Sequence, residues 1–236
     1  MNHEQEKKIS IILSTFNEEL AIEKTISEIQ KHIKNVEIIV VDDNSSDKTF
    51  EILSRLSSQN IKIFSRKKTK GLASAFLLGL INSDGEIIGW VDSNMASIVK
   101  LFPKMIENLD KSDVVLLSRF IEGGKDERNK IRKWSSFILN KITKFILRSK
   151  INDLSSGIFV MNRKVLLDTL PIASGHGEFM IEFLYNAERK GNIIKELAYT
   201  QPNDEEGNSK SYPNIFKFSL LGFFYFVRIL QIIIRR

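Results

Sequence analysis

The chain alternates short, continuous apolar runs with longer segments whose apolar residues recur every three or four positions. The short runs are typical of buried strands, and the longer segments are typical of helices that cover them. Apolar runs predict strands at 9–13, 36–41, 61–64, 86–91 and 114–117. Helical spacing fills the intervals at 15–32, 48–56, 71–81 and 101–109. This alternation favours an α/β fold in which helices cover both faces of a mostly parallel sheet.

The rhythm changes after residue 118. A polar, glycine-containing loop at 121–130 precedes one long amphipathic helix at 131–150. Further along, the pattern predicts a strand at 158–161, a helix at 179–189, a last strand at 193–198 and a polar loop at 201–211. The remaining residues are strongly apolar with scattered cations. We therefore expect one domain over residues 1–211, followed by a C-terminal helix over 212–236.

Composition narrows the class of protein. A chain of 236 residues with 42% hydrophobic and 27% charged residues suits one large α/β domain and excludes a disordered or mostly membrane-embedded chain. The absence of cysteine excludes a disulfide scaffold, a thiol nucleophile and a zinc ribbon. His3, His32 and His176 are scattered, which argues against a histidine-based metal site. The polar start has no apolar signal-peptide core, so we expect a chain that is not exported.

The net charge of +6 is unevenly distributed. Residues 131–150 carry six cations, residues 207–236 carry five, and neither segment contains an acidic side chain. The rest of the chain has 24 basic residues (35 − 6 − 5) against 29 acidic ones, a net charge of −5. Because the cations lie beside apolar residues and no nucleic-acid-binding motif occurs, the pattern favours an anionic membrane surface over nucleic acid.

Polar residues follow the predicted strands, where open parallel sheets bind their ligands. These strand ends lie at 15–18, 42–47, 92–94 and 118–119. No glycine-rich dinucleotide or P-loop motif occurs, so the usual phosphate-binding loops are missing. Carboxylates and amides at strand ends instead suit hydrogen bonds to a base and ribose, and a divalent cation that carries a diphosphate.

Several short motifs follow one another along the chain. They read STFNE at 14–18, VVDDNSSDKT at 40–49, KG at 70–71 and DSN at 92–94. They continue with SRF at 118–120, Arg132 and Ser136, DLSSG at 153–157, FMIE at 179–182 and GNSK at 207–210. Together they resemble the inverting GT-A-fold glycosyltransferases of family 2 and, within these, the polyprenol-phosphate (dolichol-phosphate) mannosyltransferases. The resemblance extends from residue 9 to about residue 210, and its order and spacing are more specific than any single motif.

The resemblance implies a GT-A (Rossmann-like) fold and an enzyme that moves a hexose from a nucleotide-diphosphate sugar to a membrane polyprenyl phosphate, with inversion. The expected donor is GDP-mannose. The nearest alternative is a family 2 enzyme that uses a UDP-glucose-type donor. A second alternative is a catalytically weak subunit that binds a nucleotide sugar and assists a partner. A membrane partner subunit or a second copy of the chain is compatible with either reading.

The resemblance also assigns roles to individual residues. Nucleotide-sugar contacts fall to Ser14, Phe16, Glu18, Val41, Asp43, Ser93, Arg119 and Lys210. Asp92 and Asn94 would hold Mg²⁺ or Mn²⁺, and Arg132 and Ser136 would receive the lipid phosphate. The candidates for a catalytic role are Asp92, Arg119 and Glu182.

The chain departs from the family pattern at five positions, of which two, Ser14 and Phe16, stand where the family has Pro and Tyr. Asn94 stands where the family has a second metal-binding Asp, and Ala96 stands where it has a Gln ligand. An amide oxygen still suits Mg²⁺ or Mn²⁺ but lacks the charge that such cations favour. Asp204 stands where the family has a loop arginine, and its charge repels a diphosphate. The departures at Asn94, Ala96 and Asp204 support the partner-subunit alternative.

Each candidate site also has a structural explanation. Residues 42–47 form good helix-capping chemistry, and residues 92–94 could be a plain turn. Glu182 lies in an apolar stretch, where a carboxylate needs a partner. We expect it to face the active site, and the alternative is an ion pair with an arginine. The helix at 131–150 either lies at a membrane surface or covers the sheet.

The C-terminal segment is the stronger membrane signal. Its apolar stretch at 218–234 is short for a membrane span and contains Arg228 and Gln231. On a helix these two residues share a narrow polar stripe with Lys217 and Arg235. We expect an interfacial helix that attaches the enzyme to the cytoplasmic face of a membrane. The alternative is that this helix packs against the domain or in a dimer.

Overall fold

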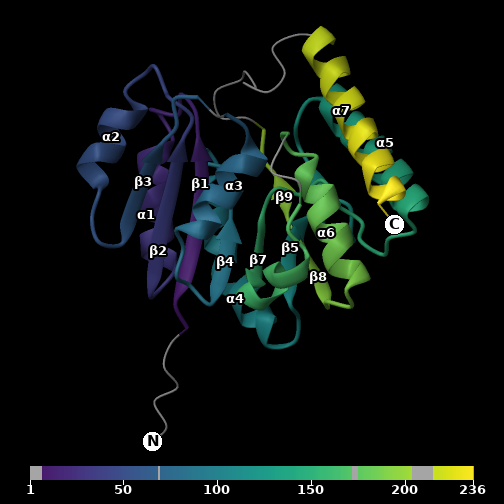
Figure 1. Ribbon diagram of the computed structural model, residues 1–236, viewed down its shortest axis with the longest axis horizontal. Coiled ribbons are helices and arrows are strands. Elements are labelled where there is room, and N and C mark those ends of the chain that lie inside the picture. Colours follow the sequence, from purple (N-terminus) through teal and green to yellow (C-terminus); the bar gives the residue numbers. More distant parts are fainter. Residues whose placement is uncertain (1–6, 69, 172–174, 204–214, 236) are drawn as a thin grey trace, which may run out of the picture.

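A seven-stranded sheet lies at the centre of the computed structural model, which describes residues 7–68, 70–171, 175–203 and 215–235 (Figure 1). Its strands, in spatial order, are β3 (Ile61–Ser65), β2 (Val36–Asp42), β1 (Ile9–Thr15), β4 (Ile87–Trp90), β7 (Phe159–Asn162), β5 (Val114–Ser118) and β8 (Ile194–Ala198). All neighbouring pairs are parallel except those that β7 forms with β4 and β5. The predicted mixed α/β fold with a mostly parallel sheet is confirmed.

The direction of β7 was not predicted. The chain leaves β5 at its carboxyl end, passes through α5 (Lys130–Leu147) and re-enters the sheet at the same edge. Phe159, the first residue of β7, is therefore paired with Leu116 near the end of β5 and with Trp90 at the end of β4. A strand that begins where its neighbours end has to run antiparallel to them.

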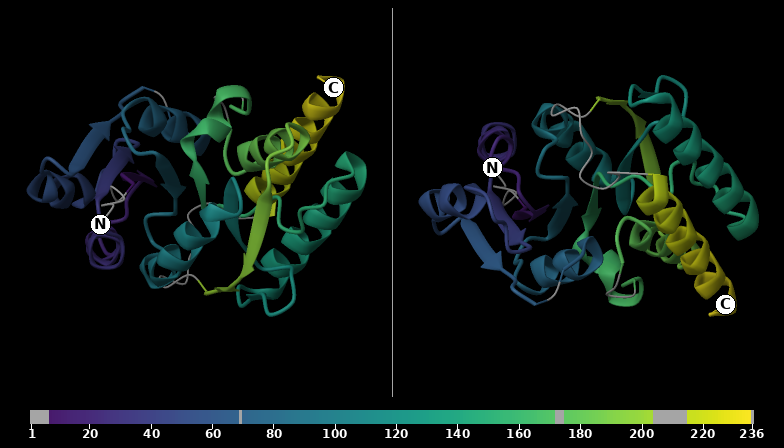
Figure 2. Two further views of the ribbon diagram at one scale, coloured as in Figure 1. Left: turned by 90° about the horizontal axis from the view of Figure 1, so that it is seen from below. Right: turned by 90° about the horizontal axis from the view of Figure 1, so that it is seen from above.

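Helices cover both faces of the sheet (Figure 2). One face packs against α1 (Ile22–His32), α2 (Thr49–Leu56) and α4 (Phe102–Glu107). The other face packs against α3 (Leu72–Ile81) and α6 (Phe179–Arg189), and the inner residues of α7 (Ile215–Ile234) extend the same core. Alternate residues of each central strand enter opposite cores, as the period of a strand requires.

Two helix boundaries differ from the prediction for local reasons. Helix α1 begins at Ile22, because Asn17 has a φ of 56° and its side-chain Oδ1 accepts a hydrogen bond from Ser46 N. The segment predicted as a helix at 101–109 is instead a chain of short helical turns, Ala96–Leu101, Phe102–Glu107 and Asn108–Asp110. Pro103 lies in the first turn of the middle one, where its missing N–H is tolerated.

Helices α5 and α7 lie side by side at one end of the molecule (Figures 1 and 2). The Asn129 side chain caps α5 by accepting a hydrogen bond from Arg132 N, and Arg148 ends it in the left-handed conformation. Ile229 and Ile232 of α7 are buried in the core it shares with α6. The boundary predicted at 211/212 lies outside the described residues. A search of the described helices finds none with the length and apolarity that a bilayer crossing needs.

Candidate functional site

The carboxyl ends of β1 and β2 are joined by hydrogen bonds between their loops. Asn17 N donates to Ser45 Oγ at 2.9 Å, and Glu18 N donates to Thr49 Oγ1 at 2.8 Å. Glu18 itself is buried. Two of the polar clusters predicted at strand ends therefore form one rigid surface at the edge of the sheet.

Asp43 is the centre of that surface. Its Oδ1 accepts hydrogen bonds from Arg66 Nε, at 2.7 Å, and from Arg66 Nη2, while its Oδ2 accepts one from Gly71 N at 2.9 Å. Arg66 Nη1 also donates to Ser74 Oγ at 2.7 Å. Since each carboxylate oxygen has two lone pairs, Asp43 keeps some capacity for a ligand. Sequence analysis missed Arg66, which follows β3 in a segment with no helical or strand periodicity.

An aromatic ring and a cation lie beside Asp43. Phe16 is 43% exposed, and Lys70 Nζ lies 4.6 Å from its ring centre. Ser14 is half-buried at the same strand end. The side chain of Val41 is fully buried in the core, so it can approach a ligand only through its backbone. The exposed ring is a surface on which a planar base can stack.

The predicted metal ligands lie on a turn after β4. The carbonyl of Asp92 accepts a hydrogen bond from Met95 N at 3.1 Å, and the side chains of Asp92 and Asn94 are both exposed. Ser93 is buried, and its carbonyl accepts a hydrogen bond from Thr25 Oγ1 at 2.7 Å. Within the described ranges no three His, Cys, Asp or Glu side chains form a metal cluster. One carboxylate and one amide fit Mg²⁺ or Mn²⁺ if substrate phosphates and water complete its coordination.

Arg119 is buried in a salt bridge at the end of β5. Its Nε donates to Asp153 Oδ2 at 2.8 Å, its Nη2 donates to Asp153 Oδ1 at 2.7 Å, and Nη2 also reaches Ser155 Oγ at 2.8 Å. Burial lowers the pKa of Arg119, but the Asp153 carboxylate outweighs it, so the pKa stays above its ordinary value. In this conformation Nε and Nη2 of the Arg119 guanidinium are hydrogen-bonded to other side chains of the protein.

Arg128 was missed by sequence analysis. Its Nε and Nη2 donate to Asp126 Oδ1 and Oδ2 at 2.9 and 2.6 Å, and Nη2 also donates to Ser136 Oγ at 3.1 Å. Burial alone raises the pKa of Asp126, but the bonds from Arg128 and the charge of Arg119 lower it overall. Arg128 lies in an irregular polar loop, so only the fold shows that it reaches Ser136.

Arg128 and Ser136 lie near the start of α5, where the lipid phosphate was predicted to bind. Arg132 is half-buried one turn before Ser136 on the same helix. Two cations and a hydroxyl therefore lie close to the amino end of an 18-residue helix, whose dipole also favours an anion.

Tyr199 links this region to the predicted metal turn. It is buried, and burial raises its pKa, as do the carboxylates of Asp153 and Asp92. The charges of Arg119 and Arg128 oppose this shift but do not cancel it. The phenol therefore remains neutral at physiological pH. The Tyr199 hydroxyl donates to Gln201 Oε1 at 2.5 Å, and Gln201 Nε2 lies 3.8 Å from Sδ of Met95, the residue that closes the turn after β4.

Glu182 forms the ion pair that sequence analysis gave as the alternative to a catalytic role. Its Oε2 accepts a hydrogen bond from Arg228 Nη1 at 2.6 Å, and its Oε1 lies 3.4 Å from Arg235 Nη1. Glu182 and Arg228 are both buried. Its catalytic role stays a prediction. The predicted Lys210, and Asp204, lie outside the described residues.

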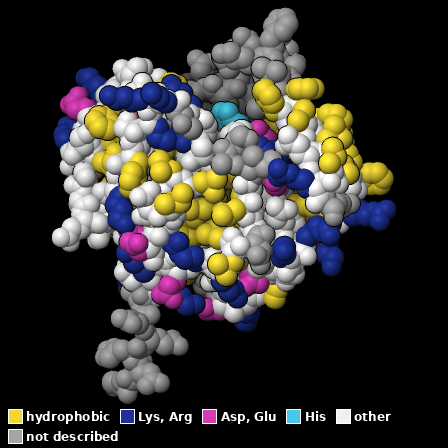
Figure 3. Space-filling model, viewed as in Figure 1, with side chains coloured by type: hydrophobic (Ala, Val, Ile, Leu, Met, Phe, Trp, Pro, Cys, Tyr) yellow, Lys and Arg dark blue, Asp and Glu magenta, His cyan; other side chains and the backbone are white. Residues whose placement is uncertain are grey.

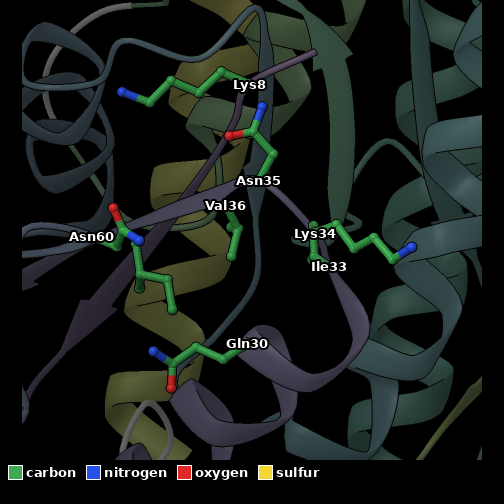
Figure 4. Close-up of a pocket in the computed structure, with 8 residues that line it drawn as sticks. Lys8, Gln30, Ile33, Lys34, Asn35, Val36 and Asn60 are labelled. Atoms are coloured by element: carbon green, nitrogen blue, oxygen red, sulfur yellow. The ribbon is translucent and has the colours of Figure 1, made fainter. Parts of the chain in front are cut away.

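A pocket lies at the opposite edge of the sheet from the candidate site (Figure 4). This pocket of about 410 Å³ is lined by Lys8, Gln30, Ile33, Lys34, Asn35, Val36, Ile38 and Asn60. Its residues surround the amino ends of β1 and β2, and it shares none of the predicted site residues.

The sequence matches the family described as Glycosyl transferase family 2 over residues 10–170. It is 33% identical over 213 residues to a dolichol-phosphate mannosyltransferase of Pyrococcus furiosus, a match that spans 86% of this chain and 59% of the relative. It is 24% identical to a polyprenol monophosphomannose synthase of Mycolicibacterium smegmatis, over 85% of this chain and 79% of the relative. The chain thus spans about three fifths of the Pyrococcus protein.

Among solved structures, the chain is similar to glucosyl-3-phosphoglycerate synthase of Mycobacterium tuberculosis. The complex of that enzyme with UDP aligns with a TM-score of 0.72 at 20% identity, over 96% of this chain and 80% of the other. A complex of the same enzyme that also contains Mn²⁺ aligns with a TM-score of 0.73 at 20% identity, again over 96% and 80% of the two chains. At this level of identity the likeness establishes the fold.

Proposed function

Because the chain belongs to glycosyl transferase family 2, we propose that it moves a hexose from a nucleotide-diphosphate sugar to the phosphate of a membrane polyprenol, with inversion. The proposed donor is GDP-mannose. Mannose is the proposed sugar because relatives over most of the chain are named as two mannosyltransferases and a polyprenol monophosphomannose synthase. We also propose residues 1–211 as the transferase domain and residues 212–236 as a separate C-terminal segment, which includes α7.

One observation carries the lipid part of this proposal. The phosphate-binding candidates Arg132 and Ser136 lie on α5, and the same helix exposes a large apolar surface. Its exposed apolar residues include Trp134, Ile138 and Phe145, of which Phe145 is 83% exposed. A helix that binds an anion near its start and is apolar along its length suits a substrate with a phosphate head and a hydrocarbon tail.

Helix α7 extends this surface. It exposes Phe223, Phe224, Phe226, Leu230 and Ile234, and apolar side chains gather over this end of the molecule in Figure 3. Arg228, by contrast, turns inward to Glu182, so the outer face of α7 is more apolar than the polar stripe suggested. We propose that α5 and α7 lie together at the cytoplasmic face of a membrane, with their cations at the headgroup level.

The chemistry needs no strong general base, because a phosphate monoester is already ionised at neutral pH. Its oxygen forms a bond to the anomeric carbon while the bond from that carbon to the diphosphate breaks, and the nucleoside diphosphate leaves. The chain's residues therefore act by positioning both substrates and by neutralising charge. A divalent cation at Asp92 and Asn94 would supply part of that neutralisation.

In the donor site, Phe16 offers its exposed ring to the base, while Asp43 and Glu18 accept hydrogen bonds from the nucleoside. Lys70, beside the ring, adds a positive charge close to the diphosphate. Arg119 holds the end of β5 through Asp153 and brings a permanent positive charge to the same region.

The partner-subunit alternative has one specific observation in its favour. Asn94 stands where the family has a carboxylate, and the donor-binding candidates Asp43 and Arg119 are hydrogen-bonded within the protein. A protein of this kind binds a nucleotide sugar and forms no product on its own.

An assay with two donors and a control without donor distinguishes these candidates. Purified protein is incubated with Mn²⁺, a short polyprenyl phosphate and radiolabelled GDP-mannose, UDP-glucose or no donor, and lipid-linked product is extracted. We expect product with GDP-mannose. Product with UDP-glucose alone would favour the second donor. Binding of GDP or UDP without any lipid-linked product would favour the partner subunit.

A further inference from the structure

Helix α7 touches the loop that precedes α6. We call residues 175–178 the glycine turn. Arg228 is 4% exposed, and its Nη1 donates to Glu182 Oε2 at 2.6 Å. Its other terminal nitrogen faces the turn, because a Cβ on Gly175 would lie 3.2 Å from Arg228 Nη2. The same side chain therefore contacts both α6 and the turn.

A second contact comes from Tyr225, one turn earlier on α7. A Cβ on Gly177 would lie 2.5 Å from the Tyr225 hydroxyl oxygen, so this hydroxyl occupies the space beside the glycine. The turn is also fixed internally, because His176 N donates to Glu178 Oε2 at 2.9 Å and Glu178 is buried.

The opposite side of the glycine turn meets the start of α3. Gly175 O accepts a hydrogen bond from Ala73 N at 3.4 Å, and a Cβ on Gly71 would lie 3.1 Å from the same oxygen. Gly71 in turn donates its N–H to Asp43 Oδ2 at 2.9 Å. One continuous set of contacts thus runs from α7 through the glycine turn to Asp43.

The packing behind these contacts is continuous as well. Phe76 of α3 lies 5.6 Å from Phe179 of α6, centre to centre, and Trp90 lies 6.1 Å from the same ring. Ile229 and Ile232 of α7 belong to that core. A shift of α7 is therefore transmitted to α3 by close-packed side chains.

We propose that Arg228 is a positioning residue for donor binding. By holding the glycine turn against Gly71, it fixes the N–H group that orients Asp43. The inference rests on the proposed function, because it takes Asp43 as a nucleoside ligand. Through these contacts Arg228 also couples the donor-binding surface around Asp43 to the proposed membrane surface of α7. Binding of α7 to a membrane strengthens donor binding, and by reciprocity donor binding strengthens membrane attachment.

The test measures binding of GDP and, separately, UDP to the full chain by calorimetry in the presence of Mn²⁺. We expect Arg228→Met to lower the affinity for whichever of the two nucleotides binds more tightly by about tenfold. The matched control is Arg235→Met, which removes the other cation near Glu182 but leaves the turn contacts in place. In this assay, which contains no membrane, it should bind the nucleotide as the unmodified chain does.

A second pair of variants leaves the ion pair between Glu182 and Arg228 intact. Gly177→Ala places a methyl group against Tyr225 and should weaken nucleotide binding, and adding Tyr225→Phe should restore it by removing the hydroxyl. The proposal is overturned if the folded Arg228→Met variant binds the nucleotide as tightly as the unmodified chain. It is also overturned if Arg235→Met weakens nucleotide binding as much as Arg228→Met does. For an Arg228→Met chain that does not fold, unchanged binding by Gly177→Ala overturns it. Absence of nucleotide binding by the unmodified chain instead removes the proposed function, and this inference with it.

Discussion

Two buried pairs of opposite charge join segments that are far apart in sequence, one at the end of β5 and one between α6 and α7. Asp153 binds Arg119 from 34 residues away, and Arg228 binds Glu182 from 46 residues away. Buried pairs of this kind add little net stability, but removing one partner leaves an uncompensated charge. Their value lies in orientation, since a guanidinium held at two oxygens has a fixed direction.

Arg128 is the residue whose role is most easily separated from the rest. Arg128→Gln should raise the KM for polyprenyl phosphate about tenfold and leave the KM for the donor sugar within about twofold. The physical reason is that Arg128 donates a hydrogen bond to Ser136, the acceptor candidate on α5, whereas Asp43 is bonded to Arg66 and Gly71. Lys125→Ala is the matched control, because Lys125 is exposed on the opposite face of the same short strand as Asp126. Equal changes in both KM values would contradict this assignment.

Glu37 gives a pH dependence that is independent of the site. Burial by itself raises the pKa of Glu37, but hydrogen bonds from Ser10, the Asp84 backbone and Lys62 lower it overall. A carboxyl with a lowered pKa stabilises the fold above its unfolded pKa of about 4.3, and this contribution is lost as pH falls further. Urea unfolding of Glu37→Gln should show about 1–3 kcal/mol less stability at pH 7. The loss of stability on acidification should also be smaller than in the unmodified chain. An identical pH dependence in both would exclude this role.

At the scale of the element, α5 and α7 differ from ordinary surface helices in the side chains that they expose. Each buries one side in the protein and exposes large apolar residues on the other, whereas most surface helices expose polar residues. Both helices carry cations, and the segments 131–150 and 207–236 contain no acidic residue in their own sequence. An apolar surface beside positive charge is what an interfacial helix presents to an anionic bilayer.

Flotation with anionic liposomes tests this surface. Phe223 and Phe226 are 58% and 52% exposed, so Phe223→Ser with Phe226→Ser should lower the bound fraction several-fold while the fold remains intact. Leu167→Ser is the control, because Leu167 is exposed on a separate short helix. Equal binding by the control and the double variant would show that these rings do not contact lipid.

Two helical glycines give a matched test of packing. A Cβ on Gly79 of α3 would collide with the side chain of Ile12, whereas a Cβ on Gly222 of α7 would meet no atom within 4 Å. Gly79→Ala should therefore lower the free energy of unfolding by about 1–3 kcal/mol through overpacking. Gly222→Ala should raise it by up to about 1 kcal/mol, because alanine is the better helix former. Thermal unfolding of both variants provides the measurement.

The sequence predicted these elements better than it predicted their contacts. The apolar runs gave every central strand to within a residue or two, because buried strands leave a continuous hydrophobic signal. Contacts between distant segments leave no such signal. The direction of β7, the bonds from Arg66 and Gly71 to Asp43, and the reach of Arg128 to Ser136 depend on how the chain folds back. For Glu182 the apolar context did predict that a partner was needed, though not which one.

At the scale of the whole molecule, the two proposed substrates meet at one edge of the sheet. The donor candidates follow β1, β2 and β4, and the acceptor candidates begin α5 just beyond β5. The parallel direction of these strands brings their ends together. Outside residues 131–150 and 207–236 the chain has a net charge of −5, so its cations are concentrated in the segments that form the proposed membrane surface. This separation of an acidic body from two cation-rich segments is consistent with sugar transfer at a bilayer.

The most direct test measures lipid-linked sugar formed from GDP-mannose and polyprenyl phosphate with Mn²⁺, by the unmodified chain, Asp92→Ala and Asn94→Asp. We predict product with the unmodified chain, a loss of at least about a hundredfold with Asp92→Ala, and half-maximal activity at a lower Mn²⁺ concentration with Asn94→Asp, which adds a charged ligand. Asp92→Ala activity close to that of the unmodified chain would contradict the assignment of the metal and diphosphate to the turn after β4. Absence of product from the unmodified chain and from Asn94→Asp would contradict the transferase itself.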